Sequence, residues 1–285
     1  QRQMCIRDSY TPPPLPVQEQ LLLVPLDSRP PCTLMAQDLG RLASIDVILP
    51  PKELLDNYRT PANREKLSSW LSHNAVKCPA VISGDLLIHG GLLASRLPQG
   101  TVNDEQNFFK LLQTMPSGED ITVFSIIPRL LVSDNLLPDA WYQWHLMRYS
   151  TLRDIVEQFG DYHSTAQLEE IKNKIPQEIL QKYNVLYSTN DSFNKQLAAL
   201  CAAKNYTLVI GQDDAQPFGL PNRNRTHAEA YMRRAGLSSA STTTCGADEI
   251  AQMLTARRFC QINNYKPKFY ICLLYTSPSP RDRSL

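Results

Sequence analysis

Two adjacent aspartates, Asp213 and Asp214, are the residues of this chain best suited to chemistry. They follow an apolar, β-branched segment at 206–210 that is typical of a buried strand, and a loop rich in Gly and Pro comes after them. Neighbouring carboxylates repel each other, and in a half-buried cleft one raises the proton affinity of the other. That arrangement suits a general acid beside an ionised partner. The alternative is structural, with one Asp capping the next helix or holding a turn.

A third carboxylate, Asp85, follows the strand expected at 80–82. Gly90 and Gly91 come shortly after it, and their lack of a side chain would let the backbone approach a ligand closely. Arg96 could pair with a carboxylate in the same place. The alternative is a tight turn followed by a solvated arginine.

Charged residues also follow the first and sixth predicted strands. Asp27 and Arg29 come after 21–26, and a fixed guanidinium there would suit a hydroxyl-rich or anionic substrate. An ion pair that orders the following Pro-rich loop is the alternative. Asp248 comes after 241–245, at the start of a helix where an acidic residue also favours the helix dipole. The further candidate binding residues are Arg129, Asn190 and Gln212.

The sequence predicts no cofactor. A hard cation such as Mg²⁺ is chemically compatible with the strand-end aspartates, but no close His or Cys spacing indicates zinc or iron. The five cysteines away from the chain ends are odd in number and far apart, so we expect free thiols: Cys32, Cys78, Cys201, Cys245 and Cys260.

The composition narrows the classes of partner that this chain is expected to bind. The net charge of +1 gives no electrostatic footprint for nucleic acid, and no apolar run reaches the length of a membrane span. With 42% hydrophobic and 20% charged residues, the chain has an ordinary globular composition. The expected partner is therefore a small-molecule or sugar substrate, and the sequence carries no signal for an oligomeric state.

Strand and helix patterns alternate along the chain, which predicts a parallel α/β architecture. The expected strands lie at 21–26, 45–49, 80–82, 121–127, 206–210, 241–245 and 268–271, with a mostly helical insertion at about 139–203. Ligands of such folds bind beyond the carboxyl ends of the strands. Because charged residues follow five of these strands, we expect an incomplete, barrel-like arrangement, with a doubly wound sheet as the alternative.

The two ends, 1–9 and 272–285, read as translations of one short DNA element in opposite orientations. The reverse complement of codons for 4–9 encodes Cys-Leu-Leu-Tyr-Thr-Ser, the sequence at 272–277. This resembles a sequencing-library adapter, so both ends are set aside and the chain is expected to be a fragment. A Pro-rich lead-in at 10–20 precedes one α/β domain at 21–271, truncated at its C-terminal end. That lead-in fits an exported protein's linker or a cytoplasmic domain's first loop equally well.

Four motifs, at 25–30, 90–96, 211–219 and 246–249, together resemble the bacterial domain-of-unknown-function family numbered 4127. The resemblance runs from about 21 to 271 and implies a longer protein with a further C-terminal part. Members tend to carry Arg-x-Arg-Asn before the paired-Asp strand. The corresponding segment here, 187–190, keeps Asn190 and lacks both arginines. The resemblance implies no activity.

The residues therefore lead to three functional hypotheses. The first is a hydrolase of a carbohydrate-like, glycosidic substrate in which Asp213, Asp214 and Asp85 are catalytic. The second is a metal-assisted hydrolase that uses the same aspartates. The third is a non-catalytic domain that binds a small ligand.

Overall fold

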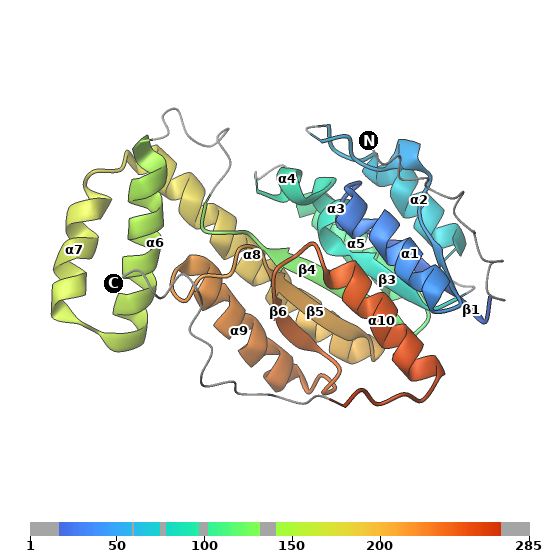
Figure 1. The fold of residues 1–285 in the computed structure, drawn as a ribbon. Helices are drawn as coiled ribbons and strands as arrows, with labels where there is room; N and C mark the ends of the chain where they lie inside the picture. Colours follow the sequence, from blue (N-terminus) through green and yellow to red (C-terminus); the bar gives the residue numbers. More distant parts are fainter. Residues whose placement is uncertain (1–16, 59, 75–77, 97–101, 132–140, 269–285) are drawn as a thin grey trace, which may run out of the picture.

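A six-stranded parallel sheet forms the centre of the molecule (Figure 1). The computed structural model describes residues 17–58, 60–74, 78–96, 102–131 and 141–268. Its strands are β1 (Glu19–Val24), β2 (Ile45–Ile48), β3 (Ala80–Ser83), β4 (Ile121–Ile127), β5 (Thr207–Gln212) and β6 (Thr242–Cys245). The parallel α/β architecture and six of the predicted strands are thus confirmed. The seventh strand, predicted at 268–271, lies outside the described residues except for its first residue. Both adapter-like ends lie wholly outside them.

The strand order is β2-β1-β3-β4-β5-β6, so the sheet is open in the described part of the chain. The preference for a barrel-like arrangement is therefore wrong. In a barrel, sequential strands are neighbours, whereas here β1 lies between β2 and β3 and pairs in parallel with both. The carboxyl ends of parallel strands meet at one edge in an open sheet as well as in a barrel. Charged residues after many strands therefore do not distinguish the two arrangements. The doubly wound alternative describes this sheet.

Helices cover both faces of the sheet. The helices of the fold are α1 (Leu34–Leu42), α2 (Arg64–Asn74), α3 (Gly84–His89), α4 (Leu92–Ser95), α5 (Val102–Thr114), α6 (Trp141–Phe159), α7 (Tyr162–Lys172), α8 (Gln177–Lys204), α9 (Leu220–Ala235) and α10 (Ile250–Ile262), with short 3₁₀ turns at Pro30–Cys32 and Lys52–Leu54. α1 and α10 lie side by side on one face, and α2, α3, α5, α8 and α9 pack on the other.

Alternating strand residues divide the core in two. Leu22, Ile82 and Val123 point toward the five-helix face, whereas Leu23 and Val81 point toward α1 and α10. This follows from the two-residue period of a strand, and the central strands β1 and β3, which are buried on both faces, carry continuous apolar runs. The carboxyl ends of the strands remain the edge where polar side chains can gather.

Three helices, α6, α7 and the first half of α8, form a helical lobe beside the sheet (Figure 1). The lobe has its own apolar cluster, which includes Tyr183 and Tyr187. Side chains of α6 cap the start of α9, because the Gly219 N–H donates to Asp154 at 2.8 Å and the Leu220 N–H donates to Ser150 at 2.8 Å. These tertiary caps explain why α9 begins directly after Gly219.

Local patterns missed the short helices α3 and α4, because they span only six and four residues and are separated by Gly90 and Gly91. Gly90 ends α3 in the left-handed region, with a φ of 88°. Among the described residues, no helix combines the length and apolar character needed to cross a bilayer.

Gly211 in β5 provides a test of the packing between the sheet and α10. A Cβ there would lie 2.6 Å from the Gly246 carbonyl oxygen and 2.6 Å from the Ile250 side chain. We expect Gly211→Ala to lower the free energy of unfolding by about 1–3 kcal/mol, the usual cost of overpacking. Denaturant unfolding measures the change. Ser69→Ala on the exposed face of α2 is the control, and an equally small effect of both changes would contradict the tight contact.

Candidate functional site

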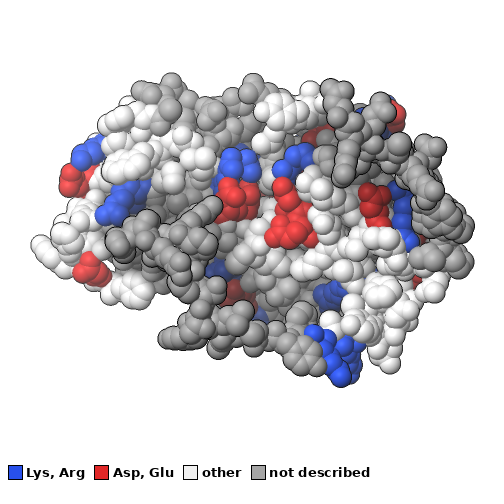
Figure 2. All heavy atoms as spheres, viewed as in Figure 1, with Lys and Arg blue, Asp and Glu red and all other residues white. Residues whose placement is uncertain are grey.

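Acidic and basic side chains lie in pairs across the middle of one face of the molecule (Figure 2). The pairs come from loops that follow different strands, so the carboxyl edge of the sheet gathers them. The sheet reverses its order between β1 and β3, and the segment after β3 therefore lies next to this switch point.

Asp85, in the first turn of α3, is the most buried of the predicted catalytic residues, with 5% of its surface exposed. Its Oδ2 accepts a hydrogen bond from the Ile126 N–H at 2.8 Å. Burial raises the pKa of Asp85 to about 7, and the nearby charge of Asp213 adds to the rise, while hydrogen bonds from Ile126 and Ser95 oppose it. Near neutral pH this carboxyl can therefore donate or accept a proton.

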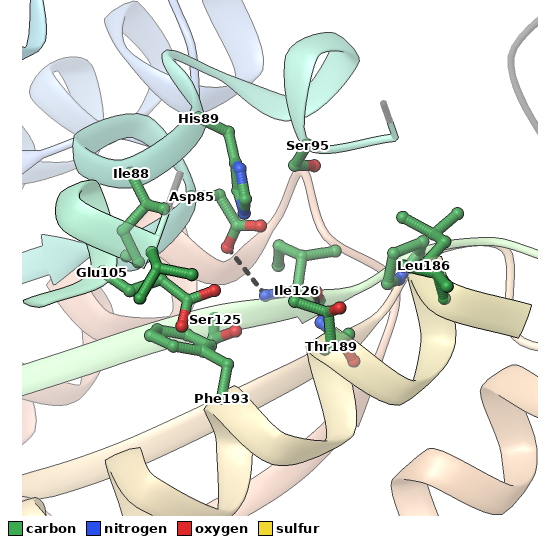
Figure 3. Close-up of a pocket in the computed structure, with 15 residues that line it drawn as sticks. Asp85, Ile88, His89, Ser95, Glu105, Ser125, Ile126, Leu186, Thr189 and Phe193 are labelled. Atoms are coloured by element: carbon green, nitrogen blue, oxygen red, sulfur yellow. Dashed lines mark hydrogen bonds between the residues drawn. The ribbon is translucent and has the colours of Figure 1, made fainter. Parts of the chain in front are cut away.

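Asp85 faces a cavity of about 240 Å³ between α3, α5, α8 and the end of β4 (Figure 3). Hydroxyl and amide groups supply part of its lining: Ser95, Ser125, Thr189 and Asn190. Ile88, Leu186 and Phe193 form apolar walls. The cavity thus combines apolar surface with a few convergent polar groups, which is the usual character of a small-molecule site.

Two further titratable groups line the same cavity. Burial raises the pKa of Glu105 above its usual value. Burial lowers the pKa of His89 to about 4, and its Nδ1 has no hydrogen-bond partner among the described residues. His89 is therefore a neutral imidazole at neutral pH, and the cavity holds two carboxyl groups beside it.

The two adjacent aspartates bind different arginines. Asp213 forms a buried ion pair with Arg96 at 2.6 Å, and Arg96 is the residue that ends α4. Asp214 has a left-handed backbone with a φ of 45° and pairs with Arg129 at 2.9 Å. Neither aspartate is among the described residues that line the Asp85 cavity. The sequence-based assignment of catalytic roles to Asp213 and Asp214 stays a prediction.

The residues after β1 form a second ion-pair group. Arg29 Nε donates to Asp27 at 2.8 Å, and its two terminal nitrogens bind Asp248 at 2.6 and 3.0 Å. This guanidinium joins the loop after β1 to the loop after β6. The Ser28 N–H donates to Asp56 at 2.6 Å, which fixes the same loop from another side. The structure thus has the ion pair proposed as the alternative role for Asp27 and Arg29.

The two glycines allow close packing of protein segments. A Cβ on Gly90 would lie 2.6 Å from Pro61, and one on Gly91 would lie 3.3 Å from the Asp56 carboxyl carbon. Asn190 lines the cavity and donates to the Ile126 carbonyl at 3.0 Å. Gln212 is fully buried, and both polar atoms of its side chain lack partners within the described residues.

The structure therefore brings Asp85 and Asn190 together in one cavity, whereas Asp213 and Asp27, each in an ion pair, are not part of its described lining. Sequence reasoning missed Glu105, because one acidic residue in an amphipathic helix carries no signal of its own. Ser125 interrupts the apolar run of β4 and could have been found from that interruption. Within the described ranges, no three His, Cys, Asp or Glu side chains are grouped so that they could hold a metal ion.

A family model described as "Protein of unknown function (DUF4127)" matches residues 21–283. The match includes most of the adapter-like C-terminal segment at 272–285. No curated protein and no solved structure matches the chain.

The two arginine pairs allow a matched test of burial. We expect Arg96→Met to lower the free energy of unfolding by about 3–5 kcal/mol, because it leaves the buried Asp213 carboxylate without its cation. Arg129→Met should cost at most about 1 kcal/mol, since Asp214 is 61% exposed. Denaturant unfolding of both variants provides the comparison. Equal losses would show that the Arg96–Asp213 pair is solvated.

The raised pKa of Asp85 predicts a pH dependence of stability. Between its ordinary pKa of 3.8 and about 7, the unfolded carboxyl loses its proton while the folded one keeps it, so rising pH favours unfolding. Relative to Asp85→Asn, the wild-type protein should lose about 4 kcal/mol between pH 4 and pH 8. Denaturant unfolding at both pH values measures this difference. A constant difference between the two proteins would mean that Asp85 titrates normally.

Proposed function

Because this chain belongs to the DUF4127 family, whose description assigns no activity, we propose a function from the geometry: a hydrolase that cleaves a carbohydrate-like small molecule in the Asp85 cavity. The observation that carries the proposal is the buried Asp85 carboxyl, whose pKa is about 7 and which faces that cavity. Strongly shifted carboxyls in clefts are typical of general acids and bases.

A second carboxyl in the same cavity supports glycoside hydrolysis. That reaction uses two carboxyl groups, one to protonate the leaving oxygen and one to activate water or attack the sugar carbon. In this proposal Asp85 donates its proton to the oxygen of the scissile bond. Glu105, once ionised, takes a proton from the attacking water, so the bond is cleaved with net addition of water.

The cavity lining supports a hydroxyl-rich substrate. Ser125, Thr189 and Asn190 present hydroxyl and amide groups that can exchange hydrogen bonds with sugar hydroxyls. Phe193 offers an apolar ring as a wall. At about 240 Å³, the cavity lies below the usual range for drug-sized ligands, about 300–1,000 Å³, which favours a single small molecule.

Asp213 is assigned a positioning role in this proposal. Its charge contributes to the raised pKa of Asp85, and its carboxylate is held by Arg96. Replacing Asp213 by Asn should therefore shift the basic limb of the activity profile, where Asp85 loses its proton, to lower pH, because a like charge near Asp85 is removed.

The other two hypotheses remain as alternative proposals. A metal-assisted hydrolase gains no support from the described residues, because Asp27, Asp213 and Asp214 each bind an arginine. A non-catalytic binding domain would use the same cavity. Such a domain would differ from the hydrolase in that it releases its ligand without cleaving it.

The decisive change is Asp85→Asn, which keeps a side-chain oxygen for the Ile126 N–H and removes the titrating proton. Across a panel of aryl glycosides, we expect the wild-type protein to release the aryl group and the variant to be at least about 100-fold slower, the typical contribution of acid–base catalysis. Glu105→Gln should show a comparable loss. Release of the aryl group is followed by absorbance.

Asp38→Asn is the matched control, because Asp38 is an exposed carboxylate paired with Arg41 on α1. It should leave turnover unchanged. Full activity of Asp85→Asn would refute the proposal. Binding of a glycoside by the wild-type protein without any cleavage would favour the non-catalytic alternative.

A further inference from the structure

A second pocket, of about 470 Å³, lies in the helical lobe between α6, α7, α8 and α9. Three cationic side chains line it, Arg153, Lys172 and Arg223, and no acidic residue is part of its described lining. For a chain with a net charge of only +1, this is a local excess of positive charge. We propose that this pocket, called here the basic pocket, binds an anionic group, a phosphate or a carboxylate.

Arg153 is the main support for this proposal. Its guanidinium donates to the Tyr149 hydroxyl at 2.9 Å and to Asn184 Oδ1 at 2.6 Å, and both acceptors are neutral. It is therefore held in position by neutral groups and has no carboxylate partner among the described residues, which is the state of an arginine that is oriented for an anionic ligand.

The other two cations are only loosely neutralised. Arg223 lies 3.6 Å from Glu157, and its buried Nε has no hydrogen-bond partner in the described part of the chain. Lys172 lies 3.4 Å from Glu169. Both glutamates are about half or more exposed, so water screens their charges and an anion in the pocket can compete for the cations.

Neutral donors complete the basic pocket. Gln177, Gln181 and Ser188 also line it and can donate hydrogen bonds. Gln177 is the first residue of α8, and Pro176 before it makes no side-chain cap. The end of a 28-residue helix with a positive dipole thus adds to the three cations.

The basic pocket adjoins the Asp85 cavity, because Val185 lines both. If the proposed hydrolase activity holds, the anion would be an acidic substituent of the substrate, as in a sugar phosphate or a uronic acid. This assignment of the anion rests on the proposed function, whereas the existence of the anion site does not.

Titration calorimetry with inorganic phosphate, and separately with succinate, tests the site on the full chain. We expect saturable binding of at least one anion to the wild-type protein. Arg153→Gln should weaken it by about tenfold or more, the usual effect of losing a hydrogen bond between charged groups. Lys172→Gln should weaken it by a smaller factor, and its exposed side chain makes this variant safe for folding.

Two controls separate this proposal from the others. Arg41→Gln removes an exposed cation on α1, which packs on the opposite face of the sheet from α8 and α9, and should leave anion binding unchanged. Asp85→Asn should also leave anion binding unchanged. The anion site can therefore be confirmed or refuted independently of the hydrolase proposal. The proposal is overturned if neither anion binds saturably, or if binding is the same in Arg153→Gln and Lys172→Gln as in the wild-type protein.

Discussion

A buried carboxylate needs a partner, and this constraint organises the edge of the sheet where the strands end. Asp27 is held by Arg29, and Asp213 is held by Arg96. Asp85 differs from both, because its partners are neutral donors, the Ile126 N–H and Ser95. A neutral donor offsets less of the cost of burying charge than a guanidinium does. The proton affinity of Asp85 therefore rises, and this carboxyl, unlike Asp27 and Asp213, faces the cavity.

The arginine pairs have a second role, because they join loops that are distant in the sequence. Arg29 connects the segment after β1 with Asp248 after β6, although three strands, β3, β4 and β5, lie between them in the sheet. Arg96 connects α4 with the end of β5. These contacts hold the carboxyl edge in one arrangement, and a preorganised edge is what a site of either proposed kind requires.

α8 links the sheet to the helical lobe and carries residues of both pockets. Asn190 and Phe193 on this helix line the Asp85 cavity, while Gln181 and Asn184, about two to three turns earlier, line the basic pocket. A single rigid helix thus sets the distance between the two pockets. Its C-terminal half packs in the main core, and Tyr183 and Tyr187 pack in the core of the lobe.

The sequence by itself determined the alternation of strands and helices, because the apolar β-branched runs and the helical spacing are local signals. It also located the polar residues at strand ends, including Asp85 and Asp213. Only the tertiary structure decided the strand order, because the local sequence of β1 carries no signal that it lies between β2 and β3. It likewise decided which carboxylates have arginine partners and which one faces a cavity, because Arg96, Ile126 and Glu105 reach the site from separate elements whose packing no single segment encodes.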